Sequence, residues 1–261
     1  MTEKTGIKSF IFIITASILL LAADTQAFME KNVTGGMSEL FLGGTKVKVD
    51  GGFIGWYDGE EIHVRAKGLD VTLNIDNSAS NEDKTFKFFV HNVNPEKTKI
   101  IGFEEGVVDK GTNSLSFSAP LKAKKITIYK LTPAVAEEEG FLFMVFGESQ
   151  GGLHVFKRIL GDINYRKPLF ALSCGDMVEE GTPGGYKDFM KEIAGVKVPF
   201  LTVVGESEVE KGSRRVYEDN LGATYYSFDY RNAMYSESLG YRDTLEQAKE
   251  AAEKFDVAAG L

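Results

Sequence analysis

The chain has 261 residues, of which 43% are hydrophobic and 26% charged, and its formal net charge is −8. This composition is that of a globular protein with an ordinary core, and the length allows one or two domains. The acidic balance argues against a nucleic acid or an anionic membrane surface as the partner, because the chain has no surplus of basic residues to neutralise a polyanion.

The first residues have the three parts of a secretory signal peptide. Lys4 and Lys8 precede an apolar stretch at 10–23, and small residues follow up to Ala27. The stretch is shorter than the roughly 20 residues of a transmembrane helix, although an uncleaved membrane anchor remains an alternative. We expect residues 1–27 to be a leader and the protein to be secreted, periplasmic or in the cell envelope. Membrane contact is expected only if the leader is retained.

Residues 28–132 are predicted to form an all-β domain. Apolar and polar residues alternate in short runs, for example at 45–49 and 71–75, and turn sequences such as Asp50-Gly51-Gly52 separate the runs. Short alternating strands at this spacing indicate an antiparallel sandwich of about seven strands, similar to immunoglobulin or fibronectin III domains. His63 and His91 lie in these strands without a partner at metal-ligand spacing, and we interpret both as structural or solvent-facing.

An acidic segment, residues 133–140, is predicted to link this domain to a second one at 141–261. The second domain contains apolar runs at 141–146, 169–174 and 200–204, and helical periodicity lies between them. This order predicts a parallel sheet covered by helices, with its first strand buried on both faces.

Polar residues follow each of these apolar runs directly after a glycine. Glu148 and Gln150 follow the first run, Asp176 follows the second, and Glu206 and Glu208 follow the third. Because the carboxyl ends of parallel strands meet at one edge, these side chains are expected to converge. An all-oxygen set would suit Mg²⁺, Mn²⁺ or Ca²⁺ better than zinc or iron. The alternative is that they are ordinary turn and N-cap residues.

Four segments within about residues 141–233 carry a resemblance to a known family. FGESQGG, SCGDMVEEGTP, VPFLTVVGESEVEKG and TYYSFDYRNA resemble, in order and spacing, the motifs of calcineurin-like metallophosphoesterases. The resemblance implies hydrolysis of phosphoric esters at a two-metal site of Mn, Mg, Fe or Zn ions. It implies that Gln150 is a metal ligand and that Asp176 bridges the metals. Glu148 and Glu206 stand at two further ligand positions, and Ser207 stands at that of the catalytic histidine.

The sequence also departs from the family pattern. Glu148 stands where the family has aspartate, Glu206 replaces asparagine, Ser207 replaces histidine, and no histidine follows His154. We therefore expect a truncated α/β domain with an incomplete metal site, and no bound metal is an alternative. One hypothesis is a secreted metal-dependent phosphoesterase-like protein whose activity on a phosphoester substrate is weak or lost. The other is a noncatalytic envelope or extracellular protein that binds a partner through the sandwich.

Several other residues attract attention but receive ordinary interpretations. The only cysteine, Cys174, excludes an internal disulfide and is expected to be buried. His154 falls off the apolar stripe of its helix and is expected to face solvent. Glu179 and Glu180 are interpreted as a solvated loop. Arg214 and its neighbour Arg215 could contact a phosphate or form surface ion pairs.

Overall fold

The computed structural model describes residues 36–104, 106–134, 140–230 and 233–237. The described chain is mainly β-sheet with few helices. The expected leader and the tail beyond residue 237 lie outside it. No helix among the described residues is both long and apolar enough to cross a membrane.

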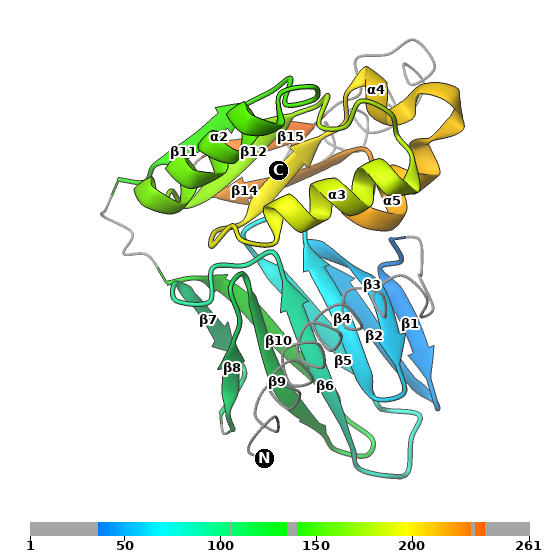
Figure 1. The fold of residues 1–261 in the computed structure, drawn as a ribbon. Coiled ribbons are helices and arrows are strands. Elements are labelled where there is room, and N and C mark those ends of the chain that lie inside the picture. The colour runs from blue at the N-terminus through cyan, green and yellow to red at the C-terminus, as the bar shows by residue number, and fades with distance from the viewer. Residues whose placement is uncertain (1–35, 105, 135–139, 231–232, 238–261) are drawn as a thin grey trace, which may run out of the picture.

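Two five-stranded sheets account for residues 39–133 (Figure 1). The first has the order β1 (Glu39–Leu42), β2 (Thr45–Asp50), β5 (Val71–Asp76), β10 (Ile126–Pro133) and β7 (Thr98–Ile101). The second has the order β3 (Gly52–Asp58), β4 (Glu61–Ala66), β6 (Lys84–His91), β9 (Ser114–Leu121) and β8 (Val108–Lys110). Neighbouring strands pair antiparallel, except that β4 and β6 are parallel.

The core of this β-rich part lies between the two sheets. Val71, Leu73 and Ile75 alternate with less buried residues along β5, and Phe86 and Phe88 do so on β6 of the other sheet. Successive side chains of a strand point to opposite faces, so the alternation in the sequence gives each sheet one apolar face. The two apolar faces share one cluster of buried residues.

The α/β part contains a three-stranded parallel sheet of β11 (Phe143–Phe146), β12 (Phe170–Cys174) and β13 (Phe200–Val203). Its remaining elements are α2 (Leu153–Arg166), α3 (Pro183–Ile193), α4 (Glu206–Val209), the 3-10 turn η1 (Glu210–Gly212), α5 (Arg214–Leu221), β14 (Tyr226–Tyr230) and β15 (Ala233–Glu237). The last two strands form a separate antiparallel hairpin.

Helices α2 and α3 cover one face of the parallel sheet through the apolar stripes expected from the sequence. Phe156 and Ile163 of α2 and Phe189 of α3 pack with Phe200 of β13. Helix α3 begins after an N-cap residue, Thr182, whose Oγ1 accepts a hydrogen bond from the Gly185 N–H at 3.2 Å.

The opposite face of the parallel sheet packs on β14 and on the β-rich part. Phe170 and Leu201 cluster there with Leu69 from the connection between β4 and β5, and Phe228 of β14 packs against them. The expectation that β11 is buried on both faces is wrong. Val145 remains 51% exposed, because β11 is an edge strand and this apolar cluster covers mainly β12 and β13.

The predicted domain limits, 28–132 and 141–261 with a link at 133–140, remain a prediction. Strand β10 continues to Pro133 and pairs there with Thr98. Residues 135–139 lie outside the part of the chain that is described.

Candidate functional site

The ends of the three parallel strands meet at one edge of their sheet. Two backbone hydrogen bonds join the turn after β11 to the turn after β12. Gln150 N–H donates to the carbonyl of Asp176 at 2.9 Å, and Glu148 N–H donates to that of Gly175 at 3.3 Å. The predicted convergence of these turns is therefore present in the fold.

Three of the predicted residues are joined by hydrogen bonds at this edge. Ser207 Oγ donates a hydrogen bond to Gln150 Oε1 at 2.7 Å. The backbone N–H of Ser207 donates to Asp176 Oδ1 at 3.2 Å. All three residues are half-buried, so they form a small polar network between the strand ends.

Glu148 and Glu206 do not join this network. Glu148 is exposed and has a left-handed backbone with φ of 52°. Glu206 is the first residue of α4 and is also exposed. Two of the four predicted metal ligands therefore face solvent.

Glu208 is fully buried and holds the turns after β12 and β13 together. Its Oε2 accepts hydrogen bonds from the N–H groups of Gly205 at 2.7 Å and Asp176 at 2.8 Å. Its Oε1 accepts from Met177 at 2.6 Å and Val178 at 3.1 Å. Four backbone donors thus share one carboxylate, which satisfies groups that would otherwise be buried without partners.

The charge of Glu208 also acts on a neighbouring tyrosine. Burial, together with this charge, raises the pKa of the Tyr186 hydroxyl. The sequence alone does not show that Glu208 is structural while Glu206 is exposed, because the two residues lie two positions apart in the same acidic turn.

Close backbone packing requires glycine in the turns that follow β12 and β13. A Cβ on Gly175 would lie 2.7 Å from the Cα of Gly205, and a Cβ on Gly205 would lie 2.4 Å from the Asp176 nitrogen. Gly175 also has a positive φ of 85°, a conformation that glycine adopts without strain. The two turns touch through their backbones, so part of the motif has a purely structural cause.

The arrangement does not fit the two-metal centre that the family resemblance implies. Among the described residues, no group of three or more His, Cys, Asp or Glu side chains is placed to hold a metal ion. Both oxygens of Glu208 are occupied by backbone donors, and Asp176 already accepts from Ser207. A divalent cation would have to compete with these hydrogen bonds for its ligands.

Other residues singled out in the sequence lie outside this network. His154 is exposed on α2, as expected. Arg214 forms an ion pair with Glu218 at 2.9 Å, and Arg215 forms one with Asp219 at 2.9 Å. The expectation that Cys174 is buried is wrong: its thiol is exposed and forms no disulfide, because it ends β12 at the open edge where the turns begin.

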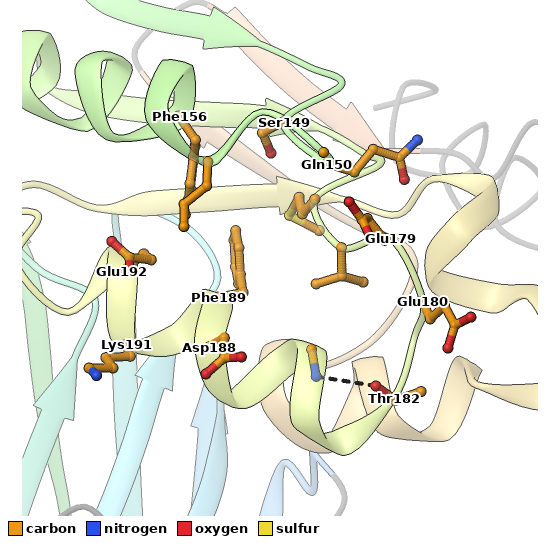
Figure 2. A pocket seen from close by; sticks show the side chains of 15 residues that line it. Ser149, Gln150, Phe156, Glu179, Glu180, Thr182, Asp188, Phe189, Lys191 and Glu192 are labelled. Atoms are coloured by element: carbon orange, nitrogen blue, oxygen red, sulfur yellow. Dashed lines mark hydrogen bonds between the residues drawn. The ribbon is translucent and has the colours of Figure 1, made fainter.

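A pocket of about 660 Å³ opens beside the strand ends (Figure 2). Its walls come from the turn after β11, the start of α2, the loop after β12, and α3. Sequence reasoning placed Glu179 and Glu180 in a solvated loop. They are indeed exposed, and they also line this pocket.

Comparisons with known proteins show only weak structural similarity. No family model matches the chain, and no curated protein matches it. Among solved structures, a purple acid phosphatase isolated from yellow lupin (Lupinus luteus) seeds is similar, with 11% identity and a TM-score of 0.38. The match covers 70% of this chain and 45% of that one, so the chain spans less than half the length of that phosphatase. Similarity of this size assigns neither a family nor an activity.

Proposed function

We propose that this chain is a noncatalytic binding protein built on a phosphoesterase-like scaffold, which does not hydrolyse phosphoric esters at its strand ends. One observation carries the proposal. The best-buried carboxylate at this edge, Glu208, has both oxygens committed to four backbone N–H groups. A carboxylate whose oxygens accept these four hydrogen bonds stabilises the turns and does not act on a substrate.

The chemistry of Ser207 supports the same conclusion. Its hydroxyl donates to the amide oxygen of Gln150, and an amide is not a base that could remove the proton and create a nucleophile. Hydrolysis also needs a positioned acid or base, and loss of one typically costs about 10²–10⁴-fold in rate. The nearest histidine in the sequence, His154, is exposed on α2.

We also propose that the β-rich part binds a partner. The signal-peptide pattern of residues 1–27 supports a location outside the cytoplasm or in the cell envelope. There a stable β-rich part and an α/β scaffold could present a ligand or protein surface.

A metal-dependent phosphoesterase is the second candidate, and one observation favours it. Gln150, Asp176 and Ser207 do come together at the strand ends, where the family resemblance places the reaction. The other two predicted ligands, Glu148 and Glu206, are exposed, and no group of three or more His, Cys, Asp or Glu side chains in the described part of the chain is placed to hold a metal.

Two measurements decide between these candidates. Hydrolysis of 4-nitrophenyl phosphate is followed with Mn²⁺ for the wild type and for Asp176→Asn. Asparagine keeps the acceptor oxygen and tolerates the left-handed backbone, where φ is 51°, so the variant should fold. The melting temperature is measured with Mn²⁺ and with a chelator.

We expect no turnover above that of the variant, and a melting temperature that neither treatment changes. The proposal fails if the wild type turns over substrate and Asp176→Asn lowers the rate at least about tenfold. It also fails if Mn²⁺ raises the melting temperature of the wild type but not of the variant, since a metal bound only by the native state stabilises that state.

A further inference from the structure

We propose that the pocket between α2 and α3 binds a small organic cation, namely an ammonium or guanidinium group attached to an aromatic or alkyl body. The inference rests on the proposed function in that it names a ligand for a binding protein. It concerns side chains other than the Gln150, Asp176 and Ser207 network, except that Gln150 also borders the pocket.

The floor of the pocket is apolar. Phe156 of α2 and Phe189 of α3 are buried and stack with their ring centroids 5.7 Å apart and an interplanar angle of 13°. Met177 and Val178 continue this surface, and Leu153 at its margin is 55% exposed. A pocket that combines such a floor with a few polar groups is typical of small-molecule sites.

The rim of the pocket is acidic. Glu179, Glu180, Asp188 and Glu192 line it together with Lys191 (Figure 2). Glu192 is already paired with Lys157 at 3.2 Å. The other three carboxylates form no hydrogen bond or ion pair within the described part of the chain. Carboxylates around a low-dielectric cleft concentrate a negative potential that attracts cations.

Ser149 supplies the observation that points to a ligand. Its side chain is only 9% exposed, lines the pocket, and has a buried Oγ with no hydrogen-bond partner among the described residues. Figure 2 shows this oxygen turned toward the pocket. A buried hydroxyl without a partner costs about 1–3 kcal/mol. An ammonium or guanidinium N–H that donates to this oxygen would remove the cost.

The start of α2 opposes a cation, as does the positive charge of Lys191 on the rim. Gly152 gives the helix no side-chain cap, and its first turn has no acidic residue, so its free N–H groups favour an anion. That preference is worth about 0.3–1 kcal/mol at an exposed helix end. The three carboxylates of the rim without an ion pair, Glu179, Glu180 and Asp188, outweigh these two effects.

The test uses three probes with one apolar body and different charge. Binding of 2-phenylethylammonium, 2-phenylethanol and 3-phenylpropionate to the full chain is measured at pH 7 by calorimetry. Perturbed NMR signals of the methyl groups of Leu153 and Val178 locate the site. We expect the cation to bind at least about tenfold more tightly than the alcohol, a difference of about 1.4 kcal/mol, and the anion to bind most weakly.

Matched variants test the charge and the hydroxyl separately. Glu179→Gln and Asp188→Asn should each weaken binding of the cation by roughly threefold or more and leave that of the alcohol unchanged. Asp162→Asn, which removes an exposed carboxylate of α2 outside the pocket, should change neither. Ser149→Ala should weaken cation binding without lowering the melting temperature, because it deletes a hydroxyl that has no partner.

Equal affinity for all three probes, preference for the anion, or no binding would each overturn the inference. None of these results depends on turnover of 4-nitrophenyl phosphate. Metal-dependent hydrolysis would overturn the proposed function. The binding measurements with the three probes would still decide whether the pocket binds a cation.

Discussion

Asn92 bonds to both backbone groups of Phe200, which lies 108 residues further along the chain. Its Oδ1 accepts from the Phe200 N–H at 2.7 Å, and its Nδ2 donates to the Phe200 carbonyl at 3.0 Å. Because β13 is an edge strand, its outward backbone groups need partners. The same amide donates to the carbonyl of Ala66 at 2.9 Å and so joins the β-rich part to the parallel sheet.

Replacement of Asn92 by alanine should destabilise the chain by about 3 kcal/mol or more, since it leaves buried backbone groups of Phe200 unpaired. Asn92 also has a positive φ of 64°, which costs alanine roughly 1 kcal/mol. Asn92→Gly relieves that strain and should be less destabilised by about the same amount. Urea unfolding followed by circular dichroism and by the fluorescence of Trp56 measures both. Equal stability of wild type and both variants would contradict the bridging role.

Removal of the Glu208 carboxylate should be among the most damaging single changes at the strand ends. Glu208→Ala leaves four backbone donors without an acceptor and should cost at least about 3 kcal/mol. Glu208→Gln keeps one acceptor oxygen and should cost about half as much. Chemical denaturation gives both values. Glu179→Ala, an exposed carboxylate nearby, is the control and should stay within about 0.5 kcal/mol of wild type.

Gly205→Ala should be destabilising although its backbone conformation is available to alanine. Its φ is −102°, so the cost comes from the new Cβ, which would lie 2.4 Å from the Asp176 nitrogen and 2.7 Å from Glu208 Oε2. We expect a loss of about 2 kcal/mol or more in the free energy of unfolding. Gly195→Ala, where a Cβ meets nothing within 4 Å, should be neutral. A neutral Gly205→Ala would show that the two turns are not in close contact.

The free energy of unfolding should fall as the pH is lowered from 6.5, because two histidines resist protonation in the fold. His63 and His91 share a hydrogen bond of 2.9 Å. Burial, with smaller contributions from His91 and Lys87, lowers the pKa of His63 from 6.5 to about 3. Burial, with the charge of Arg65, lowers that of His91 to about 4.

Both folded pKa values lie below the unfolded one, so the unfolded chain binds more protons throughout this window. The stabilisation is complete above pH 6.5 and is lost progressively toward pH 4 for His91 and pH 3 for His63. Each histidine contributes at most about 1.4 kcal/mol per pH unit. Urea unfolding between pH 5 and 8 should show this slope, and His91→Gln should reduce it. The carboxyl groups whose pKa is lowered from 3.8, Asp76 and Asp83, titrate below the measured range. An equal slope in His91→Gln would assign the effect to other groups.

The elements of the fold were largely readable from local patterns. Period-two alternation identified strands such as β5, and the helical periodicity between the apolar runs identified α2 and α3. These features depend on residues close in sequence, whose periodicity records which face of an element is buried. The apolar content of β11 was misleading, because composition does not say whether a strand lies at the edge of its sheet.

The candidate site was readable only in part. Convergence of Gln150 and Asp176 followed from parallel strands, and the packing confirmed it. The role of Glu208 did not follow, since its partners at 176–178 are about 30 residues away and are backbone groups that any sequence would supply. The pairing of His63 with His91 has the same cause, as their strands pair in parallel register.

Local residue order thus set which segments become strands and helices and which polar residues follow them. Three-dimensional packing settled which carboxylate is buried at Glu208, which thiol is exposed at Cys174, and where Ser149 meets the acidic rim of a pocket. The physical reason is that burial and hydrogen bonding depend on neighbours distant in sequence. A side chain's type limits the bonds that it can make, and the surrounding fold selects which of them it does make.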